Sequence, residues 1–368
     1  MNLTQEIKAY ALQLGFCKVG VTDMAPFPKV MEAAEERGHY DLWMARLSQG
    51  QNPRQIRPEG KSLVILALDQ TRYRAPESLK KLVGQLYVTR SHNPPAGTPV
   101  HTMLQMFEKF LTEKGIGFLS EQSCIPMRLA AERAGVAAVG RNNFAYAEGI
   151  GSFITLYAYI LDVELEQDEP AKPQCPPGCH LCIDACPTKA LTAPYMLDPK
   201  LCVCYSQYIR QAGRDETPIP MDIRPNMGCT VQGCDVCQNV CPLNKPRQQM
   251  DIPVDPYLAY LAQELSLTTL LHMPEGLYEH YVRPIMYNYF KDPKYFQRNA
   301  AIAMANTGDS GYVPELIAEL DNPDEEISAY VVWALGQLNT PEAKAALAQR
   351  QTVETSPWVR EELALALK

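Results

Sequence analysis

The sequence predicts an α+β protein, with an N-terminal α/β domain, a cysteine-rich segment and a C-terminal helical region. Three observations support this class. Runs of strand length alternate with helical periodicities over residues 1–165. Ten of the 12 cysteines lie between residues 175 and 241. Similar helical segments recur near the C-terminus, 30 and then 32 residues apart. We therefore predict three domains, at residues 1–165, 166–250 and 251–368.

The N-terminal domain begins with a helix. Leu3, Ile7, Tyr10 and Leu14 recur at helical spacing, and Gly15 can end the helix. Short apolar and β-branched runs then alternate with amphipathic stretches, which indicates an α/β or α+β domain. The sequence predicts strands over residues 16–21, 62–68, 116–119 and 153–163, and helices over residues 102–114 and 126–134.

Composition places the chain among ordinary soluble globular proteins. Hydrophobic residues make up 46% and charged residues 21%, which excludes disorder and collagen-like repeats. The apolar run at residues 63–68 is far shorter than the ~20 residues that span a bilayer. The N-terminus carries neither an apolar leader nor twin arginines, so we expect a cytoplasmic protein with no membrane partner. A net charge of −8 argues against binding nucleic acid by bulk charge alone.

The cysteine spacing predicts two 4Fe–4S clusters in a ferredoxin-like domain. A reducing compartment disfavours disulfides, so clustered cysteines there bind metal or do redox chemistry. The chain carries Cys-x3-Cys-x2-Cys-x3-Cys-Pro from residue 175 and Cys-x2-Cys-x3-Cys-Pro from residue 234, close to the bacterial two-cluster run. A structural zinc site built from the same pairs is the alternative. Two clusters need eight thiolates and the runs supply seven, so Cys202, Cys204 or Cys229 must supply the eighth.

The last domain is predicted to be a stack of helix pairs. Segments that begin at Arg298, Ser328 and Arg360 carry small and apolar residues at helical spacing, and residues 313–320 supply a partner helix. Such repeats form an α-solenoid, because each repeat buries its apolar face against the next. An ordinary helical bundle is the alternative.

Several segments resemble the epoxyqueuosine reductases, which are relatives of the corrinoid reductive dehalogenases. The resemblance covers nearly the whole chain and implies HEAT-like repeats at the C-terminus. It also implies that cobalamin binds between the N-terminal, corrinoid-binding domain and the clusters. The matching segments begin at Gly15, Trp43, Asn52, Gly60, Ala131, Gly151, Asp235 and Trp333.

The resemblance further implies which residues hold the cofactors. The chain has no Asp-x-His-x-x-Gly motif, so cobalamin is expected base-off, without a histidine ligand. Corrin contacts are expected from Arg54, His101, Arg141, Asn142, Asn143 and Ser152. One cluster is expected to take Cys175, Cys179, Cys182 and Cys241. The other is expected to take Cys186, Cys202, Cys234 and Cys237; the family places a ligand 16 residues after the first Cys-Pro, which is Cys202 here.

The expected proton donor is Glu121. It occupies the position of the family's aspartate, 14 residues before Gly135. The residues around it depart from the family pattern, and the family's Tyr-His pair becomes Val100 and His101. The scaffold is therefore closer to the family than the substrate pocket is. His101 and Tyr146 are the next candidate donors.

The activity implied by the resemblance is the reduction of epoxyqueuosine to queuosine in tRNA. Electrons would come from an external low-potential donor such as ferredoxin or flavodoxin. The alternatives are a cobalamin-dependent reductase of a small organohalide or epoxide, and a non-catalytic electron-transfer protein. Residues 297–368 carry five cations and eleven acids, a net charge of −6, which weakens the case for tRNA binding there. The cluster segment is locally basic, through Lys200, Arg210, Arg214, Arg224, Lys245 and Arg247.

Overall fold

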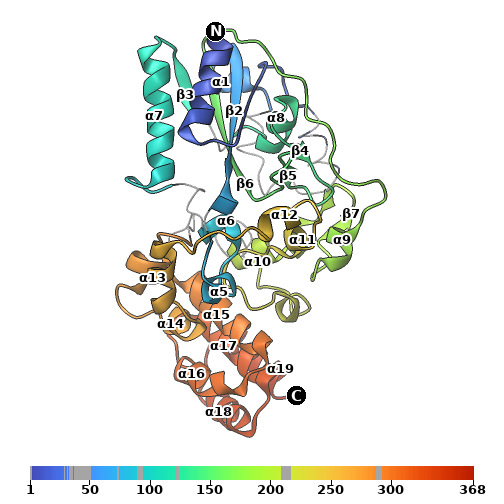
Figure 1. Cartoon of the computed structure of the whole chain (residues 1–368). Coiled ribbons are helices and arrows are strands. Elements are labelled where there is room, and N and C mark those ends of the chain that lie inside the picture. The colour runs from blue at the N-terminus through green and yellow to red at the C-terminus, as the bar shows by residue number, and fades with distance from the viewer. Residues whose placement is uncertain are drawn as a thin grey trace.

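The N-terminal and C-terminal regions form opposite ends of the molecule, in a computed structural model of the chain (Figure 1). A sheet with its covering helices forms the end that holds the N-terminus, and short helices form the other. The cysteine-rich segment lies between them, along one side. The structure describes residues 2–28, 30, 32, 36, 51–72, 74–88, 94–120, 124–208, 217–286 and 292–368.

The sheet has four strands in the order β1-β2-β6-β3, and each neighbouring pair is antiparallel. This topology makes the region α+β, one of the two classes that the pattern of elements allowed. All eight residues of β2 are buried, because both faces of this central strand are covered. The strands are β1 Lys18–Thr22, β2 Ser62–Asp69, β3 Phe118–Ser120 and β6 Ile154–Leu161.

Helices cover both faces of the sheet. Helices α1 (Leu3–Leu14) and α7 (Pro99–Glu113) pack on the face that β2 presents through Val64 and Leu66. Helix α8 (Met127–Arg133) packs on the other face. Gly15 ends α1 with a φ of 105°, a conformation that glycine adopts without the steric cost of a side chain. The predicted helices and strands of this region are therefore all present, within a few residues of their expected ends.

Residues 74–88 leave the sheet and join the core of the helical end. Helices α5 (Glu77–Lys80) and α6 (Gln85–Val88) follow the turn after β2. Leu79 and Val83 belong to the same apolar cluster as residues of the C-terminal helices. The sequence did not indicate this packing, because the segment is short and has no clear periodicity.

Among the residues described, no helix has the length and hydrophobicity needed to cross a membrane.

Short elements build the cysteine-rich segment, and longer helices follow it. Two small hairpins pair β4 with β5 and β7 with β8. The remaining elements before the C-terminal helices are α4 (Pro53–Ile56), β4 (Ala138–Val139), β5 (Ala145–Tyr146), α9 (Leu181–Ala185), β7 (Leu191–Ala193), β8 (Met196–Leu197), α10 (Val203–Tyr208), α11 (Val236–Asn239) and α12 (Lys245–Gln248).

The three sequence repeats lie on α15, α17 and α19, which pack in succession. Each of these helices begins about 31 residues after the last, with a shorter helix between them, as expected for a helical repeat. The C-terminal helices are α13 (Pro256–Glu264), α14 (Leu267–His272), α15 (Lys294–Thr307), α16 (Val313–Ala318), α17 (Glu325–Leu338), α18 (Pro341–Gln351) and α19 (Pro357–Ala366).

Candidate functional site

Cysteines from both ends of the cysteine-rich segment meet at one place. Helix α9 carries Cys182 and helix α11 carries Cys237, and the two helices pack together. Burial raises the pKa of the Cys182 thiol, and the nearby Cys175 and Cys241 raise it further. Cys175, Cys182 and Cys241, three of the four cysteines expected at one cluster, are thus neighbours, although Cys241 lies more than fifty residues after Cys182 in the chain.

A second group of thiols lies beside the first. Cys186, Cys202 and Cys237 pack around the same small apolar cluster. Burial raises the pKa of Cys234 to about 11, and the nearby Cys202 and Cys186 add to this shift. Cys237 also interacts with Cys182 of the first group. The structure therefore brings together Cys175, Cys182 and Cys241 of the first expected set and all four cysteines of the second, and it places the two groups side by side.

Cys204 lies against Cys202. A hydrogen bond from the Cys204 thiol lowers the pKa of Cys202 to about 7, and the same contact raises the pKa of Cys204. Cys229 is half-buried, and burial alone raises its pKa. Of the three candidates for the eighth ligand, Cys202 is the one that packs with Cys186 and Cys237 around the small apolar cluster. Its role as the ligand remains a prediction.

A polar turn between β4 and β5 holds both cysteine groups. The backbone N–H of Arg141 donates to Cys175 Sγ at 3.5 Å, and its Nη1 donates to the carbonyl of Cys179 at 2.8 Å. The side-chain amide of Asn142 donates to the Tyr146 hydroxyl at 2.9 Å and to the carbonyl of Cys237 at 3.3 Å. The turn therefore joins the N-terminal region to the loops of both groups.

Ser152 anchors the second cysteine motif from the other side. Its hydroxyl donates to Gln238 Oε1 at 2.9 Å and accepts from Asn244 Nδ2 at 2.9 Å. Its N–H donates to Asn244 Oδ1 at 2.8 Å. Gly151 has a φ of 98°, and a Cβ there would come within 2.1 Å of Asn244 Oδ1. The Gly-Ser pair is thus needed for this close approach, while Gln238 and Asn244 were not singled out from the sequence.

Three expected corrin contacts keep polar atoms that could bind a ligand. Within the described residues, His101 Nδ1, Arg141 Nε and Asn143 Nδ2 are buried and have no hydrogen-bond partner. Such atoms normally find one, because a buried polar group left unpaired costs ~1–3 kcal/mol. These three donors or acceptors fit a ligand rich in amide groups, as the corrin ring is.

Arg54 lies apart from the cysteine groups. Arg54 is exposed, and its Nη1 donates to the carbonyl of Gly60 at 3.2 Å, just before β2 begins. The cysteine region lies near the opposite end of that strand, where Asp69 pairs with Arg247 at 2.7 Å. An eight-residue strand separates these ends by about 23 Å. Glu121 lies outside the described residues.

A cavity of about 560 Å³ borders the second cysteine motif. Asp235 and Asn239 of that motif contribute to its wall, together with α5 and the residues after α12. Burial raises the pKa of Asp235, which accepts hydrogen bonds from the Gln85 backbone and the Gln238 side chain. The expected corrin contacts do not line this cavity.

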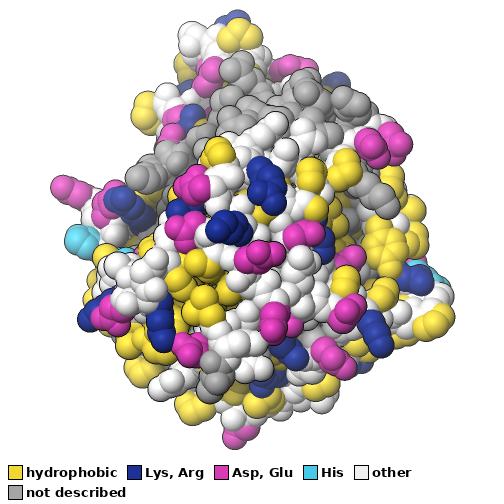
Figure 2. Space-filling model, turned by 90° about the horizontal axis from the view of Figure 1, so that it is seen from above, with side chains coloured by type: hydrophobic (Ala, Val, Ile, Leu, Met, Phe, Trp, Pro, Cys, Tyr) yellow, Lys and Arg dark blue, Asp and Glu magenta, His cyan; other side chains and the backbone are white. Residues whose placement is uncertain are grey.

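Only part of the basic character of the cluster segment reaches the surface. Arg224 is 2% exposed and pairs with Glu362, so it adds no charge to the surface. Arg247 is paired with Asp69, whereas Lys200 and Lys245 are exposed. On the face drawn in Figure 2, cationic and acidic side chains are interspersed. Arg210 and Arg214 lie outside the described residues.

Family models match two parts of the chain. Residues 175–244 match the 4Fe-4S double cluster binding domain, which identifies the two cysteine groups as a double-cluster domain and supports iron–sulfur clusters over zinc. Residues 286–368 match HEAT repeats, which confirms the predicted solenoid.

Proteins of similar length match nearly the whole chain. An epoxyqueuosine reductase from Listeria monocytogenes is 28% identical over 98% of this chain and 96% of its own. One from Bacillus cereus is 27% identical over 92% of this chain and 89% of its own. These alignments include the N-terminal region that neither family model covers.

Solved structures share the fold along the same length. A selenomethionine-labelled epoxyqueuosine reductase has a TM-score of 0.85 at 25% identity, covering 99% of this chain and 98% of that one. An epoxyqueuosine reductase with an epoxyqueuosine-modified tRNA-Tyr stem loop has a TM-score of 0.83 with the same identity and coverage. The double-cluster domain, the HEAT repeats, the full-length relatives and the solved structures all agree that this chain is similar to the epoxyqueuosine reductases along nearly its whole length.

Proposed function

We propose that this protein reduces epoxyqueuosine to queuosine in tRNA, using cobalamin and two 4Fe–4S clusters. One observation carries the proposal: the chain matches, over 99% of its length, an epoxyqueuosine reductase solved with an epoxyqueuosine-modified tRNA stem loop. The overall reaction consumes two electrons and two protons, breaks both C–O bonds of the epoxide, and yields an alkene and water.

Buried polar atoms without a partner suit a corrinoid. Arg141 Nε and Asn143 Nδ2, in the turn beside the cysteine groups, and His101 Nδ1, at the start of α7, would hydrogen-bond the amide groups at the corrin periphery. Bound cobalamin would supply a strongly reducing cobalt centre. Asn142 and Ser152 would position the corrinoid site without touching the cofactor. Their side chains already bond the loop that carries Cys237 and Gln238. Arg54 would reach the cofactor only at a part far from the clusters.

The chain's own residues would conduct electrons and deliver a proton. The eight expected cysteines would hold the clusters, and the contact between Cys182 and Cys237 would bring the two clusters close together. Glu121 would donate a proton to the departing oxygen, since a carboxyl group in a site shielded from water can stay protonated near neutral pH. One solved epoxyqueuosine reductase, from Bacillus subtilis, carries an aspartate in its catalytic loop.

The partners follow from this activity. The tRNA would be held by the few exposed cations near the clusters, such as Lys200 and Lys245, rather than by the acidic repeats. An external low-potential protein such as ferredoxin or flavodoxin would supply electrons in the cytoplasm. Binding should therefore weaken as salt is added, with a shallow slope because few phosphates are contacted.

The test is anaerobic turnover of purified tRNA that contains epoxyqueuosine. The chain, loaded with iron, sulfide and cobalamin and supplied with a chemical reductant, should convert the base to queuosine, as measured by mass spectrometry of digested nucleosides. Omission of cobalamin and the Cys234→Ala variant should each abolish conversion. Turnover of small organohalides or epoxides together with no conversion of the tRNA would overturn the proposal in favour of a small-molecule reductase.

A further inference from the structure

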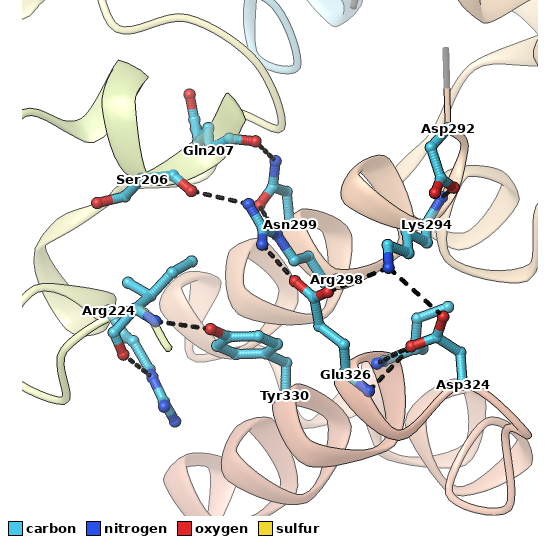
Figure 3. Close-up of polar contacts among 12 residues, drawn as sticks. Ser206, Gln207, Arg224, Asp292, Lys294, Arg298, Asn299, Asp324, Glu326 and Tyr330 are labelled. Atoms are coloured by element: carbon cyan, nitrogen blue, oxygen red, sulfur yellow. Dashed lines mark hydrogen bonds and ion pairs between the residues drawn. The ribbon is translucent and has the colours of Figure 1, made fainter. Parts of the chain in front are cut away.

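Helix α15, the first helix of the repeat region, contacts the cysteine-rich segment through two buried neighbours. Arg298 is 0% and Asn299 2% exposed. The Asn299 side chain points toward Gln207, and the Arg298 guanidinium lies between Ser206 and Glu326 (Figure 3). A buried arginine and a buried asparagine both need a hydrogen-bond partner for every N–H. The partners of these two side chains therefore show which segments α15 is attached to.

The amide of Asn299 connects two separate backbone segments. Its Nδ2 donates to the carbonyl of Gln207 at 2.8 Å and to the carbonyl of Val231 at 2.8 Å. Gln207 lies five residues after Cys202, and Val231 lies three residues before Cys234. One side chain therefore spans the two segments that carry these cysteines, and both are expected ligands of the same cluster.

Arg298 fixes the position of Asn299. Its Nη2 donates to the carbonyl of Ser206 at 2.8 Å, and its Nη1 pairs with Glu326 on α17. Lys294 lies 3.5 Å from the same carboxylate. The charge of Arg298 is thus balanced inside the repeat region, and α15 is locked between the next repeat and the cysteine-rich segment.

We propose that Asn299 is a positioning residue for the second cluster, the one expected to take Cys186, Cys202, Cys234 and Cys237. By holding the carbonyls of Gln207 and Val231 on one amide, it sets the separation of the segments that carry Cys202 and Cys234. The repeat region then helps to position the redox centre. This inference rests on the double cluster of the proposed function and is independent of the tRNA substrate and of cobalamin.

The chain offers a matched control on the same helix. Asn306 also donates from Nδ2 to two carbonyls, those of Arg224 at 2.9 Å and Gly228 at 3.0 Å. It thus makes the same kind of bridge to the same part of the chain, but away from the expected ligands. An effect specific to the cluster should follow Asn299 and spare Asn306.

The experiment compares Asn299→Asp with Asn306→Asp in the full chain, reconstituted anaerobically. Asn299→Asp keeps the shape but turns both donors into acceptors that face carbonyl oxygens. It should lose about half of its iron and sulfide, keeping the paramagnetic signal of one reduced cluster only, while Asn306→Asp keeps both clusters with wild-type reduction potentials. Asn299→Ser retains one donor, and should bind both clusters with the potential of the second one shifted.

Two results would overturn the proposal. One is Asn299→Asp with full iron content and both potentials unchanged. The other is loss of both clusters in Asn299→Asp while Asn299→Ser has wild-type potentials, which would mark Asn299 as a general folding residue. Because iron content and potentials are measured without tRNA or cobalamin, a wild-type chain that binds two clusters but reduces no tRNA would contradict the proposed function alone.

Discussion

Arg224 and Glu362 form a bidentate ion pair in the interior of the protein, with Nη1–Oε2 and Nη2–Oε1 distances of 2.9 and 2.7 Å. The Arg224 guanidinium also lies 4.7 Å from the centre of the Tyr330 ring, and its Nε donates to the carbonyl of Ile219 at 2.8 Å. This pair ties the segment between Cys204 and Cys229 to α19, the last helix of the repeats.

Removing one partner of this pair should destabilise the fold strongly. Glu362→Gln leaves a buried guanidinium without its counter-charge, and we expect a loss of about 3–5 kcal/mol in the free energy of unfolding, measured by urea denaturation. The exposed neighbour provides the control, since Glu361→Gln should change stability by less than ~0.5 kcal/mol. Equal effects of the two substitutions would show that the buried pair contributes little.

The choice of the eighth ligand is tested by iron content. Cys202→Ala should lose one cluster, and therefore about half of the iron and acid-labile sulfide, because Cys202 lies with Cys186 and Cys237. Cys204→Ala should keep both clusters, although it removes the hydrogen bond to Cys202. The opposite pattern would make Cys204 the ligand. Stoichiometric zinc without sulfide would contradict the cluster assignment altogether.

Cobalamin is expected to bind base-off, because none of the six histidines lies in an Asp-x-His-x-x-Gly motif. The absorption and the paramagnetic spectrum of Co(II) should report this state on addition of cobalamin to the reconstituted chain. Arg141→Ala should weaken binding about tenfold or more, since it removes a buried charged donor. Arg360→Ala, on α19, is the control and should bind like wild type. If the protein retains no cobalamin on gel filtration, that result would contradict its assignment as a cobalamin-dependent enzyme.

Glu121→Gln tests the proton donor. The amide keeps the shape of the side chain and removes only the acidic proton, so clusters and cobalamin should be retained. Turnover should fall ~10²-fold or more, the usual scale for general acid catalysis. The effect should appear in kcat rather than in substrate binding. Full turnover in this variant would exclude Glu121, and His101→Gln and Tyr146→Phe would then be compared in the same assay.

Stability should depend on pH through His272, at the end of α14. Its Nδ1 lies 2.7 Å from Glu319 Oε1 and its Nε2 lies 2.6 Å from Glu315 Oε2. Partial burial opposes its charge, but these two carboxylates outweigh burial and raise the pKa of His272. The charged ring therefore stabilises the folded state fully below the unfolded pKa of ~6.5, and this contribution is lost as pH rises through the higher folded pKa.

The measurement is the difference in unfolding free energy between wild type and His272→Gln. It should be larger at about pH 5.5 than at about pH 9. His280→Gln, on an exposed side chain of the same region, is the control and should show no such change. A difference that stays constant across this range would contradict the assignment.

Local sequence signals predicted the elements around the sheet. The periodicity of residues 3–14 and the apolar runs at 62–68 and 153–163 each correspond to an observed helix or strand. Their burial agrees with their pattern, because a strand covered on both faces is apolar along most of its length. The segment 74–88 carried no comparable signal, and it joined the helical core only because Leu79 and Val83 meet residues from far along the chain.

The cluster ligands of the candidate site were predictable from the sequence, but the residues that hold the ligand loops in place were less so. Cysteine spacing indicates clusters by itself, because adjacent thiolates must wrap one inorganic core. The amides of Gln238 and Asn299 gave no such signal, since a single asparagine or glutamine in a sequence is most often a surface residue. Asn299 bonds backbone carbonyls 92 and 68 residues away, and Gln238 bonds the Ser152 hydroxyl, 86 residues away.

The sequence by itself determined the ligand chemistry, the order of the elements and the repeat period, because each depends on residues close together along the chain. Only the tertiary structure decided which charges remain at the surface and which residues hold the cluster loops. Arg224 and Lys245 look alike in the sequence, yet one is buried against Glu362 and the other is exposed. Desolvation depends on every element packed around a group, and that packing follows from long-range contacts that no local pattern encodes.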